Sequence, residues 1–191
     1  IGEMLLVGFR GMNIDKNSHI LRDIQEFHIG GVILFEYDAP SGTHNRNIRD
    51  PKQVQSLCTQ LQEASSSTLL IGIDQEGGRV CRLKAKAGFD RVISPQQMAA
   101  KGTDTVRHYA RVTAKMLHRL GINLNFAPCV DVNINPDCPV IGKLERSFGS
   151  NPKEVARLAD IWMQEAEAEG VISCLKHFPG HGSSTADSHH G

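Results

Sequence analysis

The chain has 191 residues, which is enough for one domain with a sizeable hydrophobic core. Its 21 lysine and arginine residues equal its 21 aspartate and glutamate residues, so no net field favours nucleic acid or an anionic membrane as a partner. No apolar run approaches the ~20 residues that span a bilayer. Cys58, Cys129 and Cys174 lie in apolar segments without metal-type spacing, so we expect them in the core of a protein from a reducing compartment.

The first half of the sequence alternates apolar runs with helical patterns. Residues 4–9 and 32–35 are apolar runs that predict strands, and the spacing of apolar residues over 20–27 predicts a helix between them. The polar stretch 36–49 is predicted to be a loop, because proline, glycine and asparagine recur in it. The next helix is indicated by a capping aspartate, a proline at the first helical position and an apolar stripe: Asp50, Pro51, Val54, Leu57, Cys58 and Leu61.

The second half repeats this pattern. A third apolar run covers 69–73, a one-sided apolar pattern predicts a helix over 104–120, and a fourth strand is predicted over 122–126. The last helix is predicted to begin after the Asn151-Pro152 cap and to end at Gly170.

Five strands that alternate with helices, the fifth over 171–175, imply parallel pairing through right-handed crossovers. An open doubly wound sheet and a (β/α)₈ barrel are the candidate folds. No glycine-rich nucleotide-binding motif follows any strand, which disfavours the first. We therefore predict an α/β chain, residues 1–191, that supplies about the first five βα units of a (β/α)₈ barrel and continues beyond Gly191. Barrel sites are assembled from many strand ends, and the polar residues at these ends are Arg10, Glu36, Asp74, Glu76, Asp131, Lys176 and His177.

The most informative segment follows the fifth apolar run. Charged and imidazole groups come directly after the apolar residues 171–175, in residues 176–182 and in the motif Asp187-Ser188-His189. This pattern predicts a buried strand that places reactive side chains at its carboxyl end. In the Asp187–His189 pair the carboxylate can receive one ring N–H, and the other ring nitrogen is then presented as an acid or a base. The alternative is a surface pair without coupling.

Lys176 and His177 stand next to each other at this strand end. Adjacent side chains of a strand diverge, so we expect the two to contact different parts of a ligand. A lysine is rarely buried without a partner, which favours a ligand with hydroxyl or carboxylate groups. A structural role is an equal alternative for His177, and His181 is expected to brace the loop rather than to react.

Two further segments carry candidate ligand-binding groups. Residues 74–79 place two carboxylates beside paired glycines, which would allow close backbone approach to a substrate, and Arg82 is near enough in sequence to reach the same pocket. An internal salt-bridge network is the alternative. Arg146 is a loop arginine that is suited to bidentate contact with a ligand.

A metal site is the rival chemistry. The sequence contains no H-E-x-x-H or H-x-H pair, and the Pro179-Gly180 turn interrupts the spacing that a helix-borne site needs. We therefore expect no metal ion. The residues that such a site would use are His177, His181, His189, Asp187 and Asp131.

Four segments, 73–80, 126–131, 146–149 and 176–189, together resemble the family 3 glycoside hydrolases, in particular the bacterial β-N-acetylglucosaminidases (β-hexosaminidases) of peptidoglycan recycling. The resemblance spans essentially the whole chain. It implies a (β/α)₈ barrel whose mobile loop carries a His–Asp acid/base pair, and that role falls on His189 and Asp187. By the same match, the terminal N-acetylglucosamine would be bound by Asp74, Arg82, Arg146, Lys176 and His177.

The mechanism that this resemblance implies is retaining, proceeds through a covalent glycosyl-enzyme and needs no cofactor. The nucleophile is expected beyond Gly191. The expected partner is a small carbohydrate such as an N-acetylglucosamine-containing muropeptide, and the expected location is the bacterial cytoplasm. A periplasmic or lipoprotein form stays open, because the chain starts at Ile1 rather than methionine.

Residues 36–49 are longer than expected for the compact cytoplasmic members, which leaves room for altered recognition of the leaving group. Three alternatives to this function remain: a glycoside phosphorylase, another family 3 glycosidase, and a noncatalytic sugar-binding fragment of a barrel.

Overall fold

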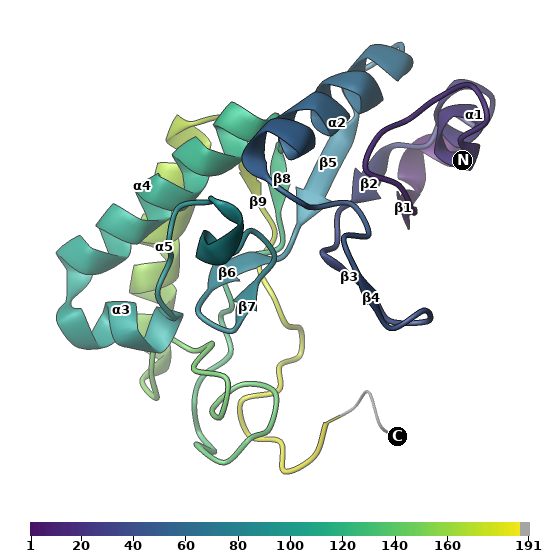
Figure 1. Ribbon diagram of the computed structural model, residues 1–191. Coiled ribbons are helices and arrows are strands. Elements are labelled where there is room, and N and C mark those ends of the chain that lie inside the picture. The colour runs from purple at the N-terminus through teal and green to yellow at the C-terminus, as the bar shows by residue number, and fades with distance from the viewer. Residues whose placement is uncertain (188–191) are drawn as a thin grey trace. The chain divides into compact units, whose positions relative to one another are not determined.

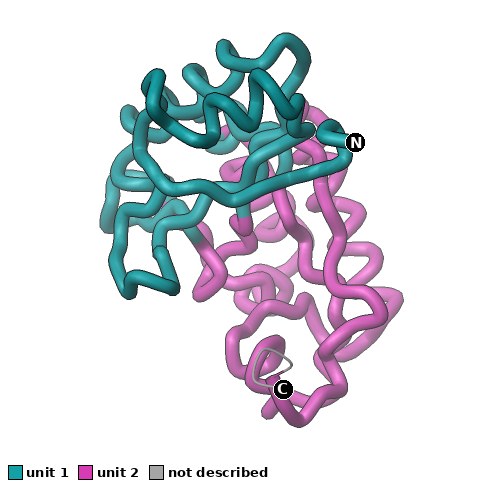
Figure 2. Tube along the Cα trace, turned by 90° about the vertical axis from the view of Figure 1, so that its right-hand side faces the viewer, with its two compact units in different colours: residues 1–73, 82–90, 116–124 teal, residues 74–81, 91–115, 125–191 magenta. Residues whose placement is uncertain are grey.

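The computed structural model describes residues 1–187 of the chain (Figure 1). The chain divides into two compact units, which Figure 2 shows in different colours. Unit 1 comprises residues 1–73, 82–90 and 116–124, and unit 2 comprises residues 74–81, 91–115 and 125–191.

Unit 1 contains a parallel sheet. Its strands β1 (Leu6–Gly8), β2 (Gly31–Ile33) and β5 (Leu70–Ile73) pair in that order. Val32 and Ile71 lie opposite each other in the register, and both are buried. The predicted strands 4–9, 32–35 and 69–73 are therefore confirmed, with shorter bounds.

Strand β8 (Leu124–Asn125) follows β5 in the sheet order, and β9 (Ile172–Ser173) follows β8. In unit 1 the backbone N–H of Asn123 donates to the carbonyl of Ile71 at 3.2 Å. In unit 2 the N–H of Cys174 donates to the carbonyl of Asn125 at 2.9 Å. All five strands predicted from the apolar runs are therefore present, and the α/β class with a parallel sheet is confirmed.

Unit 1 contains the helices α1 (His19–Gln25) and α2 (Pro51–Ala64), and it also contains short 3₁₀ helices at Gly2–Met4 and Ala85–Ala87. The cap predicted for α2 is present, because a carboxylate oxygen of Asp50 accepts the Gln53 backbone N–H at 2.9 Å. The predicted apolar stripe of α2 is buried throughout: Val54, Leu57, Cys58 and Leu61.

In unit 2, α5 (Pro152–Ala168) begins at the predicted cap and contacts β9 (Figure 1). The side chain of Asn151 accepts the backbone N–H groups of Lys153 at 2.9 Å and Glu154 at 3.3 Å. Helix α4 (Thr103–Leu120) runs from unit 2 into unit 1 and matches the predicted helix over 104–120.

Helix α3 (Pro95–Lys101) was not predicted. Its start carries the same signal as the other two capped helices, because Ser94 accepts the Gln97 backbone N–H at 3.3 Å and Pro95 follows at the first helical position. Its seven residues are too few to show a clear helical spacing of apolar residues, so the spacing did not predict this helix.

The polar stretch 36–49 is not only a loop. It contains the antiparallel hairpin of β3 (Tyr37–Asp38) and β4 (Thr43–His44) in unit 1. The buried carboxylate of Asp38 accepts the Ser41 hydroxyl at 2.6 Å and forms an ion pair with Arg10 at 2.9 Å. These contacts stabilise the hairpin in a segment whose composition alone predicts irregular structure.

The prediction that the fifth strand is buried was wrong in part. Val171 is buried, but Ile172 and Leu175 are about half exposed, at 53% and 49%, and Cys174 is exposed rather than in the core. Strand β9 is the last in the sheet order, so among residues 1–187 no further strand pairs with its outer edge. Cys58 and Cys129 are buried, as predicted. None of the helices in residues 1–187 has the length and apolar character that crossing a membrane requires.

Candidate functional site

The candidate site lies in unit 2, after the ends of three strands. Asp74 directly follows β5, Asp131 comes six residues after β8, and Lys176 comes three residues after β9. The carboxyl ends of parallel strands are where barrel and open α/β domains assemble their sites.

The glycines of the 74–79 segment serve local packing. Strands β6 (Gln75–Gly77) and β7 (Val80–Cys81) form a hairpin whose turn places Gly77 at φ +101° and Gly78 at φ +59°. A Cβ would lie 2.3 Å from the Ile93 carbonyl oxygen at Gly77 and 2.6 Å from the Ser94 Cβ at Gly78. The expectation that these glycines bring the backbone close to a substrate is therefore corrected: they bring it close to this neighbouring segment.

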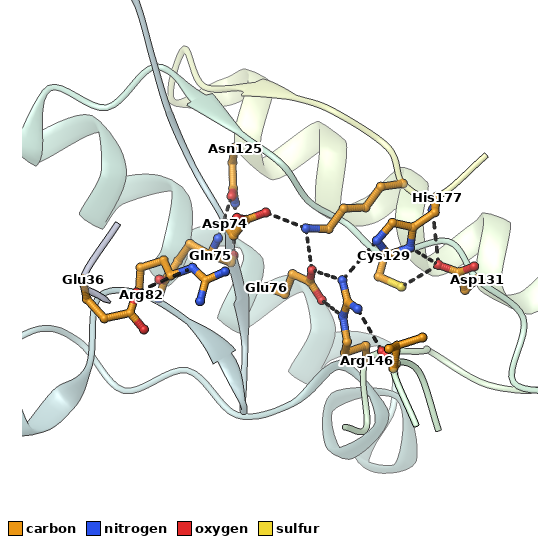
Figure 3. Close-up of polar contacts among 12 residues, drawn as sticks. Glu36, Asp74, Gln75, Glu76, Arg82, Asn125, Cys129, Asp131, Arg146 and His177 are labelled. Carbon is orange, nitrogen blue, oxygen red and sulfur yellow. Dashed lines mark hydrogen bonds and ion pairs between the residues drawn. The ribbon is translucent and has the colours of Figure 1, made fainter. Parts of the chain in front are cut away.

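The centre of the site is a buried ion pair between Glu76 and Arg146. Nε and Nη2 of Arg146 each donate to one carboxylate oxygen of Glu76 at 2.8 Å, and Nη1 donates to the Val140 carbonyl at 2.8 Å (Figure 3). The Glu76 side chain is 0% exposed and that of Arg146 is 11% exposed. Burial alone would lower the pKa of Arg146, but the carboxylate of Glu76 raises it, so the guanidinium stays charged. The bidentate contact expected of Arg146 is thus made within the protein.

Lys176 joins this pair to Asp74. Its ammonium nitrogen lies 2.7 Å from a carboxylate oxygen of Asp74 and 2.6 Å from one of Glu76. The Lys176 and Asp74 side chains are 16% and 18% exposed, so both keep an edge toward solvent. The internal salt-bridge network, which was the alternative for this segment, is therefore present.

His177 is held through both ring nitrogens. Nδ1 lies 2.5 Å from Oδ2 of Asp131, and Nε2 lies 3.2 Å from Nη2 of Arg146. A guanidinium only donates hydrogen bonds, so Nε2 is the acceptor and the ring proton sits on Nδ1, facing the carboxylate. The ring is 28% exposed, so it keeps a face for a ligand although its nitrogens are engaged.

Asp131 fixes the position of His177 (Figure 3). Its buried carboxylate also accepts the Cys129 thiol and the His177 backbone N–H, each at 3.2 Å, and the His181 backbone N–H. Burial would raise the pKa of Asp131, but these hydrogen bonds, the His177 ring first, hold that pKa below its usual range. The backbone contact of His181 agrees with the bracing role expected for that residue.

The lowered pKa of Asp131 predicts that the folded protein loses stability in acid. The stability that the Asp131 carboxylate contributes is fully present above its unfolded-state pKa, about 3.9, and is lost as pH falls toward the lower folded-state value. We expect Asp131→Asn to be less stable than the wild type at neutral pH and to lose less stability between about pH 4 and pH 2. Thermal unfolding of the wild type and the variant, measured across this pH range, checks both expectations. If the two melting temperatures fall in parallel with pH, Asp131 is not the source of the acid sensitivity.

Lys176 and His177 have different direct partners within the protein, and their expected contact with different parts of a ligand stays a prediction. Lys176 contacts Glu76, His177 contacts Arg146, and Glu76 and Arg146 are paired with each other, so both side chains converge on one ion pair. Strand β9 ends at Ser173, but Lys176 still forms a parallel bridge with Cys129.

The structure thus brings together four of the five predicted sugar-binding residues: Asp74, Arg146, Lys176 and His177. Arg82 belongs to unit 1, where it lies 3.6 Å from Glu36 and its guanidinium stacks over Phe35. Its role toward the sugar stays a prediction.

The acid/base pair is described only in part. Asp187 is partly exposed, and His189 lies outside the described residues, so the pairing of the two stays a prediction. The central roles of Glu76 and Asp131 were not predicted from the sequence. Their positions after strand ends were the available signal, but spacing alone does not show that Glu76 faces Arg146 or that Asp131 faces His177.

A group of possible metal ligands is present, but it differs from the one considered from the sequence. The ligand atoms of Cys129, Asp131 and His177 lie within 4.8 Å of one another. Burial raises the pKa of the Cys129 thiol, which therefore stays protonated and donates to Asp131, and the nearer nitrogen of His177 is engaged with the same carboxylate. A metal ion would have to displace both hydrogen bonds.

A parallel α/β chain whose ionic and imidazole groups gather after the strand ends has the arrangement of a barrel-type enzyme domain. Residues 1–191 match the family described as the glycosyl hydrolase family 3 N terminal domain, and the chain belongs to this family. The resemblance of the four sequence segments is thereby confirmed.

Individual relatives support the same family assignment. "Beta-hexosaminidase LpqI" of Mycobacterium tuberculosis is 42% identical over 191 residues, which are 100% of this chain and 45% of that protein. A solved glycoside hydrolase family 3 β-N-acetylglucosaminidase from Paenibacillus sp. matches with a TM-score of 0.86 and 37% identity over 98% of this chain and 34% of the other. NagZ from Neisseria gonorrhoeae, solved in complex with N-trifluoroacetyl-D-glucosamine, matches with a TM-score of 0.83 and 30% identity over 97% of this chain and 52% of the other. The chain spans about half or less of the length of these relatives.

Proposed function

We propose that the protein is a β-N-acetylhexosaminidase that releases terminal, non-reducing β-linked N-acetylglucosamine from peptidoglycan-derived fragments. The observation that carries this proposal is the connected group of Asp74, Glu76, Arg146, Lys176 and His177, in a chain whose family relatives include β-hexosaminidases.

The group suits a sugar ligand because it combines acceptors and donors at fixed positions. Sugar hydroxyls both donate and accept hydrogen bonds, so Asp74 and Lys176 together can bind neighbouring hydroxyls of one ring. The buried Glu76–Arg146 pair keeps the Lys176 and His177 side chains in place without a ligand. Such preorganisation reduces the entropy that binding would otherwise cost.

The proposed chemistry is retaining. His189, oriented by Asp187, protonates the leaving oxygen while a carboxylate attacks the anomeric carbon, and His189 then deprotonates the water that releases the sugar. Asp74, Glu76 and Asp131 are each engaged in ion pairs or hydrogen bonds within the site. None of the three is therefore assigned as the nucleophile.

Hydrolysis of an aryl β-N-acetylglucosaminide by the full-length protein tests the proposal. We expect turnover in phosphate-free buffer that a metal chelator leaves unchanged. Turnover only with added phosphate would indicate a phosphorylase, and sugar binding without turnover would indicate a noncatalytic module. A cytoplasmic location in a bacterial cell belongs to the same proposal and is tested by cell fractionation.

A further inference from the structure

The segment that carries the proposed acid/base pair is preceded by a turn, residues 180–184, that is attached to another stretch of unit 2. This second stretch, residues 131–138, comes after β8. Both stretches lie within the described residues, and neither forms a helix or a strand. Contacts between the two stretches, rather than a helix or a sheet, therefore determine where the turn lies.

Asn135 makes two of these contacts. Its backbone N–H donates to the Gly182 carbonyl and its side-chain Nδ2 donates to the Ser184 carbonyl, both at 2.9 Å. Asn135 is itself held in a turn, because its backbone carbonyl accepts the Cys138 N–H at 3.0 Å and its Oδ1 accepts the Asp137 N–H at 3.1 Å. A fixed donor thus holds the backbone of Ser184, three residues before the proposed acid/base pair begins.

The other contacts hold the same turn at His181 and Gly182. The Asp131 carboxylate accepts the His181 backbone N–H, and the buried Cys138 thiol donates to the His181 carbonyl at 3.2 Å. Gly182 is buried against Val132, and a Cβ at Gly182 would collide with the Val132 carbonyl. Residues 181, 182 and 184 are therefore each held by the 131–138 stretch.

Ser184 links this turn to Asp187. Its backbone N–H donates to the His181 carbonyl at 2.9 Å, which closes the turn. Its hydroxyl donates to the Ala186 carbonyl at 2.6 Å and accepts the Ala186 backbone N–H at 3.2 Å. Ala186 directly precedes Asp187, so the position of Ser184 determines where the backbone reaches Asp187.

We propose that Asn135 is a positioning residue for the acid/base pair, because it holds the Ser184 carbonyl and thereby the start of the segment that contains Asp187 and His189. The inference rests on the proposed function, in which His189 transfers the proton. Proton transfer depends on alignment, and a misplacement of about 1 Å can lower a rate about 10²-fold. Within residues 1–187, the hydrogen bonds of Asn135 reach none of the proposed sugar-binding residues.

The variant Asn135→Asp in the full-length protein tests this role. The new carboxylate can still accept the Asp137 N–H, but it cannot donate to the Ser184 carbonyl. For a phenyl β-N-acetylglucosaminide, whose leaving group needs a proton, kcat/KM should fall about ten- to a hundredfold. For a dinitrophenyl β-N-acetylglucosaminide, whose leaving group needs none, kcat/KM should change much less. The inhibition constant of free N-acetylglucosamine should stay the same, because the sugar contacts are retained.

Two comparisons separate positioning from a structural role. In the His189→Ala background, Asn135→Asp should cause no further loss with the phenyl substrate, because both changes remove the same function. Asn151→Asp is the matched control: it introduces the same charge at the cap of α5, where a carboxylate still accepts the backbone N–H groups of Lys153 and Glu154. Its kcat/KM values should equal those of the wild type. An equal loss for both leaving groups, or the full loss again in the His189→Ala background, would overturn the inference.

If Asn135→Asp does not fold, Asn135→Ser replaces it with the same expectations, because a serine side chain is uncharged and too short to reach the Ser184 carbonyl. Failure of the proposed function gives a different result: the wild type then hydrolyses neither aryl substrate, and hydrogen exchange replaces the kinetics. The Ser184 and Ala186 amides should then exchange about tenfold faster in the Asn135 variant than in the wild type or in Asn151→Asp. Faster exchange supports the attachment through Asn135, and equal exchange overturns it.

Discussion

Replacing Glu76 by alanine is expected to lower the free energy of unfolding by about 3–5 kcal/mol, because the change leaves a buried charge without its partner. Arg146 would lose both carboxylate contacts, at 2.8 Å each, and Lys176 would lose one of its two carboxylates. His177 would lose a fixed neighbour at Nε2, since Glu76 positions the guanidinium that contacts it. Urea-induced unfolding of the variant and the wild type measures the effect, and sugar binding should weaken with it.

The control for this prediction is an ion pair of the same chemistry at the surface. Glu154 and Arg157 lie 2.6 Å apart in α5, with both side chains 48% exposed. Water screens such a pair, so Glu154→Ala should change the stability little or not at all. Equal losses in the two variants would show that the Glu76–Arg146 pair is not the buried anchor of the site.

Replacing His189 by alanine should lower the rate of the complete enzyme roughly 10²–10⁴-fold, which is the usual contribution of general acid–base catalysis. In the glycosylation step the loss should shrink for aryl leaving groups that need no proton. Asp187→Asn should cost less, because it misorients the ring without removing it. Rates measured over a series of aryl leaving groups check this, and a loss that does not depend on the leaving group would indicate a structural histidine.

The fold could largely be read from the sequence, because its signals are local. The apolar runs gave five strands, and the Asp50 and Asn151 caps gave the starts of two long helices. The structure differs from the prediction where contacts between distant residues determine the local conformation or the burial. The hairpin within 36–49 depends on the Asp38 network, and the exposure of β9 depends on its place at the end of the sheet order.

For the site, the sequence indicated which residues matter better than what each one contacts. Asp74, Lys176 and His177 were found from their positions after strand ends. The engagement of Arg146 with Glu76 could not be predicted, because 70 residues separate them and only the fold brings them together. The same holds for Asp131 and His177, which are 46 residues apart.

The most direct test of the account is a crystal structure of the full-length protein with N-acetylglucosamine bound. We predict sugar hydroxyls at hydrogen-bonding distance, about 2.6–3.2 Å, from Asp74 and Lys176, with the exposed face of His177 against the ring. The Glu76–Arg146 pair should keep its bidentate geometry. A sugar bound away from these residues, or a divalent ion held by His177 and Asp131 at about 2.0–2.2 Å, would contradict the account.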